Sequence, residues 1–266
     1  MKLTKANYFT SKNKYLSNSK INDWLKDKEY FYKRHISNEI DKEETPSLRL
    51  GKAVDYYVFD GPAKFAKKYK MVARRSKEPE KRIIELPTAE YQEVIEMGQK
   101  INRQDAMKEV KKWYKTQVIL QNDLDLGHFT GICGILDALY IDKNKEKAII
   151  MDLKTSKEIL PKKYFWHCIK YNYIRQLAMY SILVEKNYGI TDIEYQHLVM
   201  EKDPDGIYNC QTFVFEKDLI KKEVENIWKL LEEIKRETKF LPRNVGWKDA
   251  VMIGKAREYE SEGVEI

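Results

Sequence analysis

Residues 134–155 read Gly-Ile-Leu-Asp-Ala-Leu-Tyr-Ile-Asp-Lys-Asn-Lys-Glu-Lys-Ala-Ile-Ile-Met-Asp-Leu-Lys-Thr, and this stretch decides the fold class. Its two ends, 134–141 and 147–155, are rich in Ile, Leu and Ala, which is typical of β-strands. The polar residues between them predict a loop over 143–146. The stretch therefore predicts an antiparallel hairpin.

The register of this hairpin would bring two carboxylates together. With a loop over 143–146, Asp142 pairs with Lys147, and counting outward puts Asp137 directly opposite Asp152. Alternation of side chains places both aspartates on one face, and Lys154 joins them because it follows Asp152 by two residues. A register slip of one residue would undo this opposition.

Opposed carboxylates predict a metal site. Directly opposed residues of a β-pair have Cβ atoms about 4.5–5.5 Å apart, and like charges there destabilise the pair. A divalent cation offsets the repulsion, and hard oxygen ligands suit Mg²⁺, with Mn²⁺ as a substitute. Such a site supports phosphodiester hydrolysis, in which Lys154 could orient the attacking water or neutralise developing charge. The alternative is that Asp137 and Asp152 lie at solvated strand ends and that Lys154 simply pairs with one of them.

The composition indicates a folded chain and excludes several classes of site. The 266 residues carry 49 Lys and Arg against 42 Asp and Glu, a net charge of +7, and 12% are aromatic, which argues against disorder. Three widely spaced cysteines without a CxxC spacing argue against disulfides, zinc and iron–sulfur clusters, and favour reduced thiols in a cytosol. No Walker A sequence is present, so no nucleotide cofactor is expected. No stretch is long and apolar enough to span a membrane.

The rest of the chain predicts helices around a group of strands. Ser19 and Ser47 are expected to cap two helices, Thr88 to open a third, and residues 64–86 to be basic and irregular. Further predicted strands are 116–121, 193–200 and 208–215, the last two joined by a turn at 203–206, and further predicted helices are 107–113, 164–169, 173–184 and 219–235. This order indicates a mixed α/β (α+β) fold with a central mixed sheet flanked by helices, in one domain over 1–266.

Several of these residues together resemble a known family. They follow one another as Asp137, Asp152-Leu153-Lys154 and Gln176-Leu-Ala-Met-Tyr180. The combination is similar to the PD-(D/E)XK nuclease superfamily, and within it to the RecB/RecE-like phage and prophage exonucleases. Upstream, residues 50–55 resemble that branch's Gly-x-Ala-x-His helix, and residues 17–21 resemble its opening segment. The resemblance runs from about residue 15 to 215 and implies a restriction-endonuclease-like catalytic core over about 114–240, preceded by a helical part over about 1–113.

The resemblance implies a metal site with one departure from the family pattern. Asp137 and Asp152 would be metal ligands, and the backbone carbonyl of Leu153 would add an oxygen. Lys154 would be the catalytic lysine. Where the branch usually has a metal-binding His, this chain has Asp55. Carboxylate is a competent ligand for Mg²⁺, so Asp55 is either a further ligand or a residue on the solvated face of its helix.

The resemblance also implies residues that contact the nucleic acid. Gln176 and Tyr180, at i and i+4 on one helix, would line the active site beside DNA, although alone they favour a core-edge pair packed through Tyr180. Lys52 and Arg175 neighbour the proposed site in sequence and are candidates for phosphate contacts. Some relatives place a Glu on the strand before Asp137, and three residues in that neighbourhood cannot be assigned a role: Gln121, Asp123 and Asp125.

The expected function is Mg²⁺-dependent exodeoxyribonuclease activity on linear double-stranded DNA during phage or prophage recombination. The exonuclease polarity, the recombination role, a single-strand annealing protein as partner and a ring-shaped homo-oligomer rest on the resemblance alone. Three alternatives are open: an endonuclease or RNA-acting relative with the same site, a non-catalytic DNA-binding protein with a decayed metal site, and a structural or assembly protein of a phage.

Overall fold

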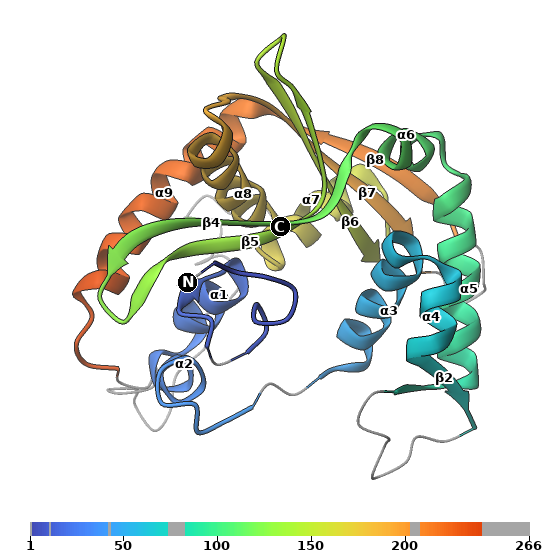
Figure 1. The fold of residues 1–266 in the computed structure, drawn as a ribbon, viewed down its shortest axis with the longest axis horizontal. Helices are drawn as coiled ribbons and strands as arrows, with labels where there is room; N and C mark the ends of the chain where they lie inside the picture. Colours follow the sequence, from blue (N-terminus) through green and yellow to red (C-terminus); the bar gives the residue numbers. More distant parts are fainter. Residues whose placement is uncertain (1, 11, 42–43, 74–82, 203–207, 241–266) are drawn as a thin grey trace, which may run out of the picture.

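A six-stranded mixed sheet forms the centre of the molecule (Figure 1). This computed structural model describes residues 2–10, 12–41, 44–73, 83–202 and 208–240. The strands lie in the order β1, β5, β6, β7, β8, and β4 pairs with β5. Their bounds are β1 (Tyr15–Leu16), β4 (Lys115–Leu126), β5 (Phe129–Asp142), β6 (Lys147–Ser156), β7 (Asp192–Glu201) and β8 (Cys210–Phe215). The predicted mixed α/β fold with a central sheet is confirmed.

Parallel and antiparallel pairs are both present in this sheet. The pairs β4–β5, β5–β6 and β7–β8 are antiparallel, whereas β1–β5 and β6–β7 are parallel. A parallel pair needs a long crossover, and between β6 and β7 the chain forms α7 (Pro161–Lys170) and α8 (Tyr173–Tyr188). These two helices therefore follow directly on the strand that carries Asp152 and Lys154.

Helices cover both faces of the sheet. Besides α7 and α8 they are α1 (Asn18–Lys26), α2 (Lys28–His35), α3 (Pro46–Asp60), α4 (Pro62–Lys68), α5 (Thr88–Arg103), α6 (Asp105–Trp113) and α9 (Lys217–Arg236). One hydrophobic core joins α8 and α9 to the sheet and includes Ile150 and Leu183. A second core joins α3 and α5 to the opposite face and includes Val54 and Met151. Figure 1 shows α1 and α2 on one side of the molecule and α3, α4 and α5 on the other.

The central hairpin has the predicted register. Its pairing begins at Asp142↔Lys147 and ends at Ala138↔Met151. Beyond this last pair β6 stays paired with β7, while the opposite edge of β5 stays paired with β4. The two strands of the hairpin therefore part from one another where Asp137 and Asp152 lie. We call this point the fork.

Two helices begin two residues earlier than the sequence predicted. The side chain of Ser17, rather than Ser19, accepts a backbone N–H at the start of α1. Thr45, rather than Ser47, caps α3 in the same way, and the proline that follows it has the φ angle that a first helical turn requires. Helix α5 begins at Thr88, as predicted.

The basic segment 64–86 is ordered where the structure describes it, contrary to the prediction. Helix α4 leads into β2 (Tyr69–Val72), which pairs in parallel with β3 (Ile84–Pro87). Neither strand shows a clear alternation of apolar and polar residues, and no short turn motif in the sequence joins them, so the sequence did not predict this pair. The predicted turn at 203–206 lies outside the described residues. Among the helices that the structure describes, none is long and apolar enough to cross a membrane.

Candidate active site

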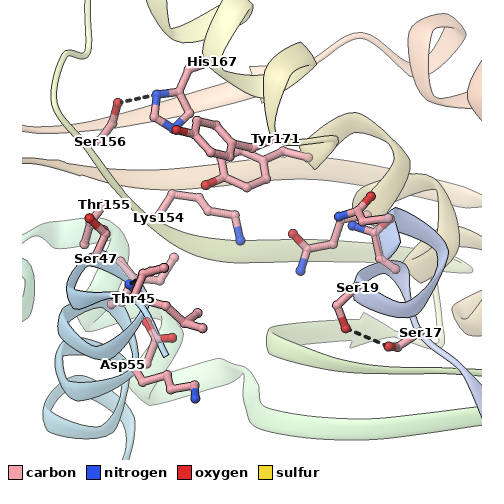
Figure 2. Close-up of a pocket in the computed structure, with 18 of the residues that line it drawn as sticks. Ser17, Ser19, Thr45, Ser47, Asp55, Lys154, Thr155, Ser156, His167 and Tyr171 are labelled. Atoms are coloured by element: carbon pink, nitrogen blue, oxygen red, sulfur yellow. Dashed lines mark hydrogen bonds between the residues drawn. The ribbon is translucent and has the colours of Figure 1, made fainter. Parts of the chain in front are cut away.

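A cleft of about 780 Å³ opens beside the fork of the β5–β6 hairpin. Residues of β6 line it, together with residues of α1, α3, α7 and α8. Figure 2 shows Lys154 between Asp55 on the α3 side and Ser17 and Ser19 on the α1 side. The two helix starts described above therefore face each other across Lys154. Most of the residues that line it carry a hydroxyl, amide or amine group, which suits a hydrated, charged ligand.

The charged residues that line the cleft are predominantly basic. It carries one acidic residue, Asp55, and the following lysines: Lys52, Lys154, Lys157, Lys170 and Lys202. A concave surface lined by one sign of charge attracts ligands of the opposite sign. The cleft therefore favours an anionic ligand such as a phosphodiester backbone.

Asp55 reaches the cleft from the middle of α3. Arg49 on the same helix donates two hydrogen bonds to Glu90 of α5, at 2.9 and 2.6 Å, and only 6% of Arg49 is exposed. A bidentate pair of this kind holds α3 firmly against α5. Because Asp55 lines the cleft, the structure favours a position at the site over a solvated helix face. Its role as a metal ligand stays a prediction.

Asp137 is held through both of its carboxylate oxygens. Just beyond the last pair of the hairpin, the backbone N–H of Leu153 donates to Oδ2 at 2.9 Å. The side-chain amide of Gln117 donates to Oδ1 at 3.1 Å. These two bonds fix the orientation of the carboxylate against β6. Asp137 thus contacts the residue that follows Asp152, which agrees with the predicted register.

Gln117 is a residue that the sequence analysis missed. It lies in β4 between the pairs Thr116↔Ala138 and Val118↔Leu136, and it therefore faces Asp137 across the strands. Its φ of +52° is in the left-handed region, which costs a residue other than glycine about 1 kcal/mol or more. Strained backbone of this kind concentrates at functional sites. The strand was predicted, but no turn fixed its register on β5, so the sequence held no signal for this contact.

Lys154, which lines the cleft, forms an ion pair with the buried Asp152. The side chain of Asp152 is 2% exposed and that of Lys154 is 14% exposed. Burial lowers the pKa of Lys154, but the charges of Asp152, Tyr173 and Asp137 outweigh it, so that the pKa lies above its usual value. Lys154 is therefore an ammonium at neutral pH. Its Nζ also lies 4.7 Å from the centre of the Tyr173 ring, within cation–π range.

Two carboxylates at the site carry an unfavourable charge. Burial and the charge of Asp152 raise the pKa of Asp137 to about 7. Burial and the charge of Asp137 raise the pKa of Asp55 well above its usual range. The ammonium of Lys154 lowers both pKa values but does not cancel these effects. The site therefore has an excess of negative charge, which a further cation would neutralise.

The residues at the fork fit a hard divalent cation by their chemistry. Carboxylate oxygens are the donors that Mg²⁺ and Mn²⁺ take from proteins, and the excess negative charge would favour such an ion. Within the described part of the chain, however, no group of three or more His, Cys, Asp or Glu side chains is already arranged to hold a metal. The fit therefore rests on donor type and charge, and not on a preformed cage.

Gln176 and Tyr180 lie on α8 and are linked to each other and to the sheet. The Gln176 amide donates to the Tyr180 hydroxyl at 2.7 Å, and that hydroxyl donates to the carbonyl of Ile135 at 2.7 Å. Both residues line the cleft, and Tyr180, which is 6% exposed, also belongs to the core. A Cβ at Gly134 would lie 2.7 Å from Cε1 of Tyr180, so the glycine makes room for this ring. Tyr180 therefore packs at the edge of the core and faces the cleft at the same time.

The two candidate phosphate contacts differ in their surroundings. Lys52 is exposed, lines the cleft and pairs with Glu44 at 2.9 Å, so its amine is accessible to a ligand. Arg175 is only 7% exposed. Its guanidinium donates to the side-chain oxygens of Asn18, at 3.1 Å, and of Asn22. These buried bonds argue against the predicted direct contact with phosphates, and they indicate that Arg175 holds the α1 side of the cleft in place.

The three unassigned residues on β4 make contacts that hold the fold together. Gln121 donates to the hydroxyl of Tyr15 at 2.8 Å, and that hydroxyl donates to Asp123 at 2.7 Å. Asp125 pairs with Lys235 of α9 at 3.3 Å. These contacts tie β1 and α9 to the sheet.

A family model matches residues 17–246, and its description is a PDDEXK-like domain of unknown function (DUF3799). The chain belongs to this family. The predicted resemblance to the PD-(D/E)XK superfamily is thereby confirmed, and the matched residues of this PDDEXK-like domain include the fork, α3 and α8. Curated proteins give no match.

A solved structure shares the fold of this PDDEXK-like domain. A candidate exonuclease from Eubacterium rectale matches with a TM-score of 0.65 and 16% identity, over 99% of this chain and 100% of that chain. A phage-related exonuclease from Haemophilus somnus 129PT matches with a TM-score of 0.30 and 14% identity, over 56% of this chain and 73% of that chain. The first likeness shows a shared fold along the whole chain, and the second is too low to support an argument.

Proposed function

We propose that this PDDEXK-like domain is a divalent-metal-dependent nuclease that hydrolyses phosphodiester bonds in DNA. The observation that carries the proposal is the fork, where Asp137, Asp152 and Lys154 meet directly beneath a cleft that Lys154, Asp55 and four further lysines line. The carboxylates suit metal ions, and the lysines suit a nucleic-acid backbone. The family description and the exonuclease named among the structural neighbours support the same function.

The carboxylates of Asp137, Asp152 and Asp55 would hold the metal, and the backbone carbonyl of Leu153 would add an oxygen. Mg²⁺ is the expected ion, and Mn²⁺ would substitute for it. Such an ion, when bound, polarises the scissile phosphate and lowers the pKa of an attacking water. The raised pKa values of Asp137 and Asp55 support this assignment, because both reflect negative charge that lacks a cation.

The other residues of the site would position groups and stabilise charge. Asp152 would release Lys154 from their ion pair on becoming a ligand, and the free ammonium could then orient the attacking water or stabilise charge on the phosphate. Gln117 and the Leu153 N–H would keep Asp137 in one orientation. Gln176, anchored through Tyr180, would contact the DNA strand from the α8 side.

The finer features of the proposal rest on the family resemblance. They are the preference for ends of linear double-stranded DNA and the role in phage or prophage recombination. A single-strand annealing partner, a ring-shaped homo-oligomer, a location in the cytosol and a single domain over 1–266 also stay predictions. Among the phosphate contacts first expected, Lys52 is retained in the proposal and Arg175 is not.

The decisive experiment incubates the purified protein with end-labelled linear duplex DNA, with Mg²⁺ or with EDTA. Circular duplex and RNA of the same sequence serve as parallel substrates. We expect progressive shortening of the linear duplex that requires Mg²⁺. Absence of a product with either Mg²⁺ or Mn²⁺ would overturn the nuclease assignment, and equal cleavage of circular duplex would overturn its exonuclease part.

A pair of variants links the activity to the fork. Asp152→Asn removes the charge that pairs with Lys154, and it should abolish cleavage while most of the DNA binding remains. Asp142→Asn is the matched control, because Asp142 lies at the turn end of the same hairpin and its Oδ1 accepts the Asn144 N–H at 3.1 Å. An asparagine there keeps this acceptor. A D152N protein that cuts as fast as the wild type would show that the site is elsewhere.

A further inference from the structure

Helix α7 presents large apolar side chains to solvent directly beside the cleft. Trp166 is 48% exposed and Tyr171, at the end of the helix, is 47% exposed. Phe165 and Ile169 are exposed to a similar extent. Exposed aromatic residues gathered on one short helix are unusual for a surface without a partner. They therefore require an explanation that the catalytic site does not supply.

The charge of α7 indicates the kind of partner. The helix spans Pro161–Lys170 and contains Lys162, Lys163 and Lys170 but no acidic residue. Lys163 forms an ion pair with Glu158 at 2.5 Å. Lys170 lines the cleft, and its Nζ lies 5.7 Å from the centre of the Tyr171 ring. Alternating amines and rings match a ligand that carries phosphates and flat faces together.

A cluster of three rings lies between this surface and Lys154. Tyr171 and Tyr173 are stacked, with ring centres 5.9 Å apart and planes at 25°, and Tyr173 in turn lies against Lys154. His167 packs against both rings, with its centre 4.4 Å from that of Tyr171 and 5.7 Å from that of Tyr173. Figure 2 shows Tyr171 and His167 on the same wall of the pocket, beside Lys154. The ring cluster thus joins Lys154 at the fork to the C-terminal end of α7.

Trp166 lies one helical turn before Lys170, which lines the cleft. It precedes Lys170 by four residues, so both side chains lie on one side of α7. A strand leaving the fork past Tyr171 would meet Lys170 and then Trp166. The bases of a duplex are stacked inside the helix and offer no free face to these rings, whereas an unpaired strand does.

We propose that α7 and Tyr171 form a binding platform for single-stranded DNA, on which Tyr171 and Trp166 stack against unpaired bases while Lys170 contacts phosphates. This proposal rests on the proposed function and extends it, since it assigns the unpaired strand, rather than the duplex, to the α7 wall of the cleft. The platform would separate the strand to be cut from its complement as it enters the fork.

The test measures binding without cleavage. Fluorescence anisotropy in EDTA compares a labelled single-stranded oligothymidylate with a labelled duplex, using the wild type, Trp166→Ala and Tyr171→Ala. We expect each variant to bind the single strand about tenfold more weakly, with a much smaller effect on the duplex. Trp166→Phe and Tyr171→Phe keep a stacking face and should restore most of the affinity. Lys170→Ala should reduce the salt dependence of binding by about one charge.

Trp113→Ala is the matched control, because Trp113 is 61% exposed at the end of α6 and is not part of the platform. Its affinity for the single strand should equal that of the wild type. The proposal is overturned if the wild type does not bind the oligothymidylate, if the platform variants bind it as well as the wild type, or if W113A loses as much as they do. Light scattering that shows a dimer in the wild type and a monomer in W166A would instead assign α7 to a contact between copies.

The two proposals fail in different ways. If the platform is correct and the nuclease assignment is wrong, the single strand binds with the expected variant pattern but no Mg²⁺-dependent product forms. If the nuclease assignment is correct and the platform is wrong, Mg²⁺-dependent cleavage occurs, and W166A and Y171A both bind and cut like the wild type.

Discussion

Replacing Asp137 by asparagine should stabilise the metal-free protein while abolishing its activity. Burial and Asp152 raise the pKa of Asp137 from 3.8 to about 7. Because the folded-state pKa lies above the unfolded value, the folded protein binds the extra proton between pH about 4 and pH 7. Stability is therefore lost as the pH rises through this window, and the full penalty applies above it.

The size of the effect follows from the shift. The rise in the pKa of Asp137 from 3.8 to about 7 corresponds to a loss of folding stability of about 4 kcal/mol. This value is an upper bound, because Asp137 is only partly shielded from solvent and neighbouring groups relax. We expect D137N to gain about 1–3 kcal/mol at pH 8 and 1 kcal/mol or less at pH 5. Its amide oxygen can still accept from the Leu153 N–H, and the Gln117 amide can turn to accept from the new donor.

Urea denaturation in EDTA at pH 5 and pH 8 measures this difference. Asp142→Asn controls for the introduction of an amide into the same strand. Thermal unfolding should show a rise of about 2–4 °C for each kcal/mol gained at pH 8. A D137N protein that is less stable than the wild type at pH 8, or equally affected at both pH values, would refute the conclusion that uncompensated charge is concentrated at the fork.

Three further predictions concern the same site. Gln117→Asn keeps a residue that tolerates the left-handed backbone, but its shorter side chain no longer reaches Asp137. The affinity for Mn²⁺, measured by titration calorimetry, should therefore fall about 10- to 100-fold without loss of thermal stability. A parallel loss of stability would indicate a purely structural role. Gly134→Ala places a methyl group 2.7 Å from the Tyr180 ring and should cost about 1–3 kcal/mol in urea denaturation, and an unchanged midpoint would contradict the packing described. Metal binding followed by calorimetry should tighten as the pH rises through about 7, because Asp137 must lose its proton to become a ligand; affinity independent of pH from 6 to about 8 would argue against Asp137 as a ligand.

The parts of the fold that depend on local signals could be predicted from the sequence. The register of the β5–β6 hairpin follows from its turn and from the alternation of apolar residues, and it correctly placed Asp137 beside the β6 backbone. The helix from Thr88 and the i, i+4 pair of Gln176 and Tyr180 are equally local features. These signals were enough to locate the candidate site.

The parts that were missed depend on contacts between distant segments. Strand β1 pairs with β5, and β2 pairs with β3, between residues that are distant in the sequence, so no short turn motif predicts either pair. The contact from Gln117 depends on how β4 aligns with β5, and the burial of Arg175 depends on how α1 packs beside α8. The predicted positions of both helix caps were two residues too late. Several Ser and Thr residues occur at the starts of α1 and α3, and the capping preference of these residue types does not distinguish among them.

The walls of the cleft belong to different hydrophobic cores. Helix α3, with Asp55, packs with α5, whereas α8, with Gln176, packs with α9, and only the sheet is common to both. Substitutions between α3 and α5 would therefore change the affinity for a metal ion without changing the contacts that the α8 wall makes with a DNA strand. Such a division would let the metal requirement and the substrate preference of family members change independently. Substitutions in one hydrophobic core would alter the first, and substitutions in the other core would alter the second.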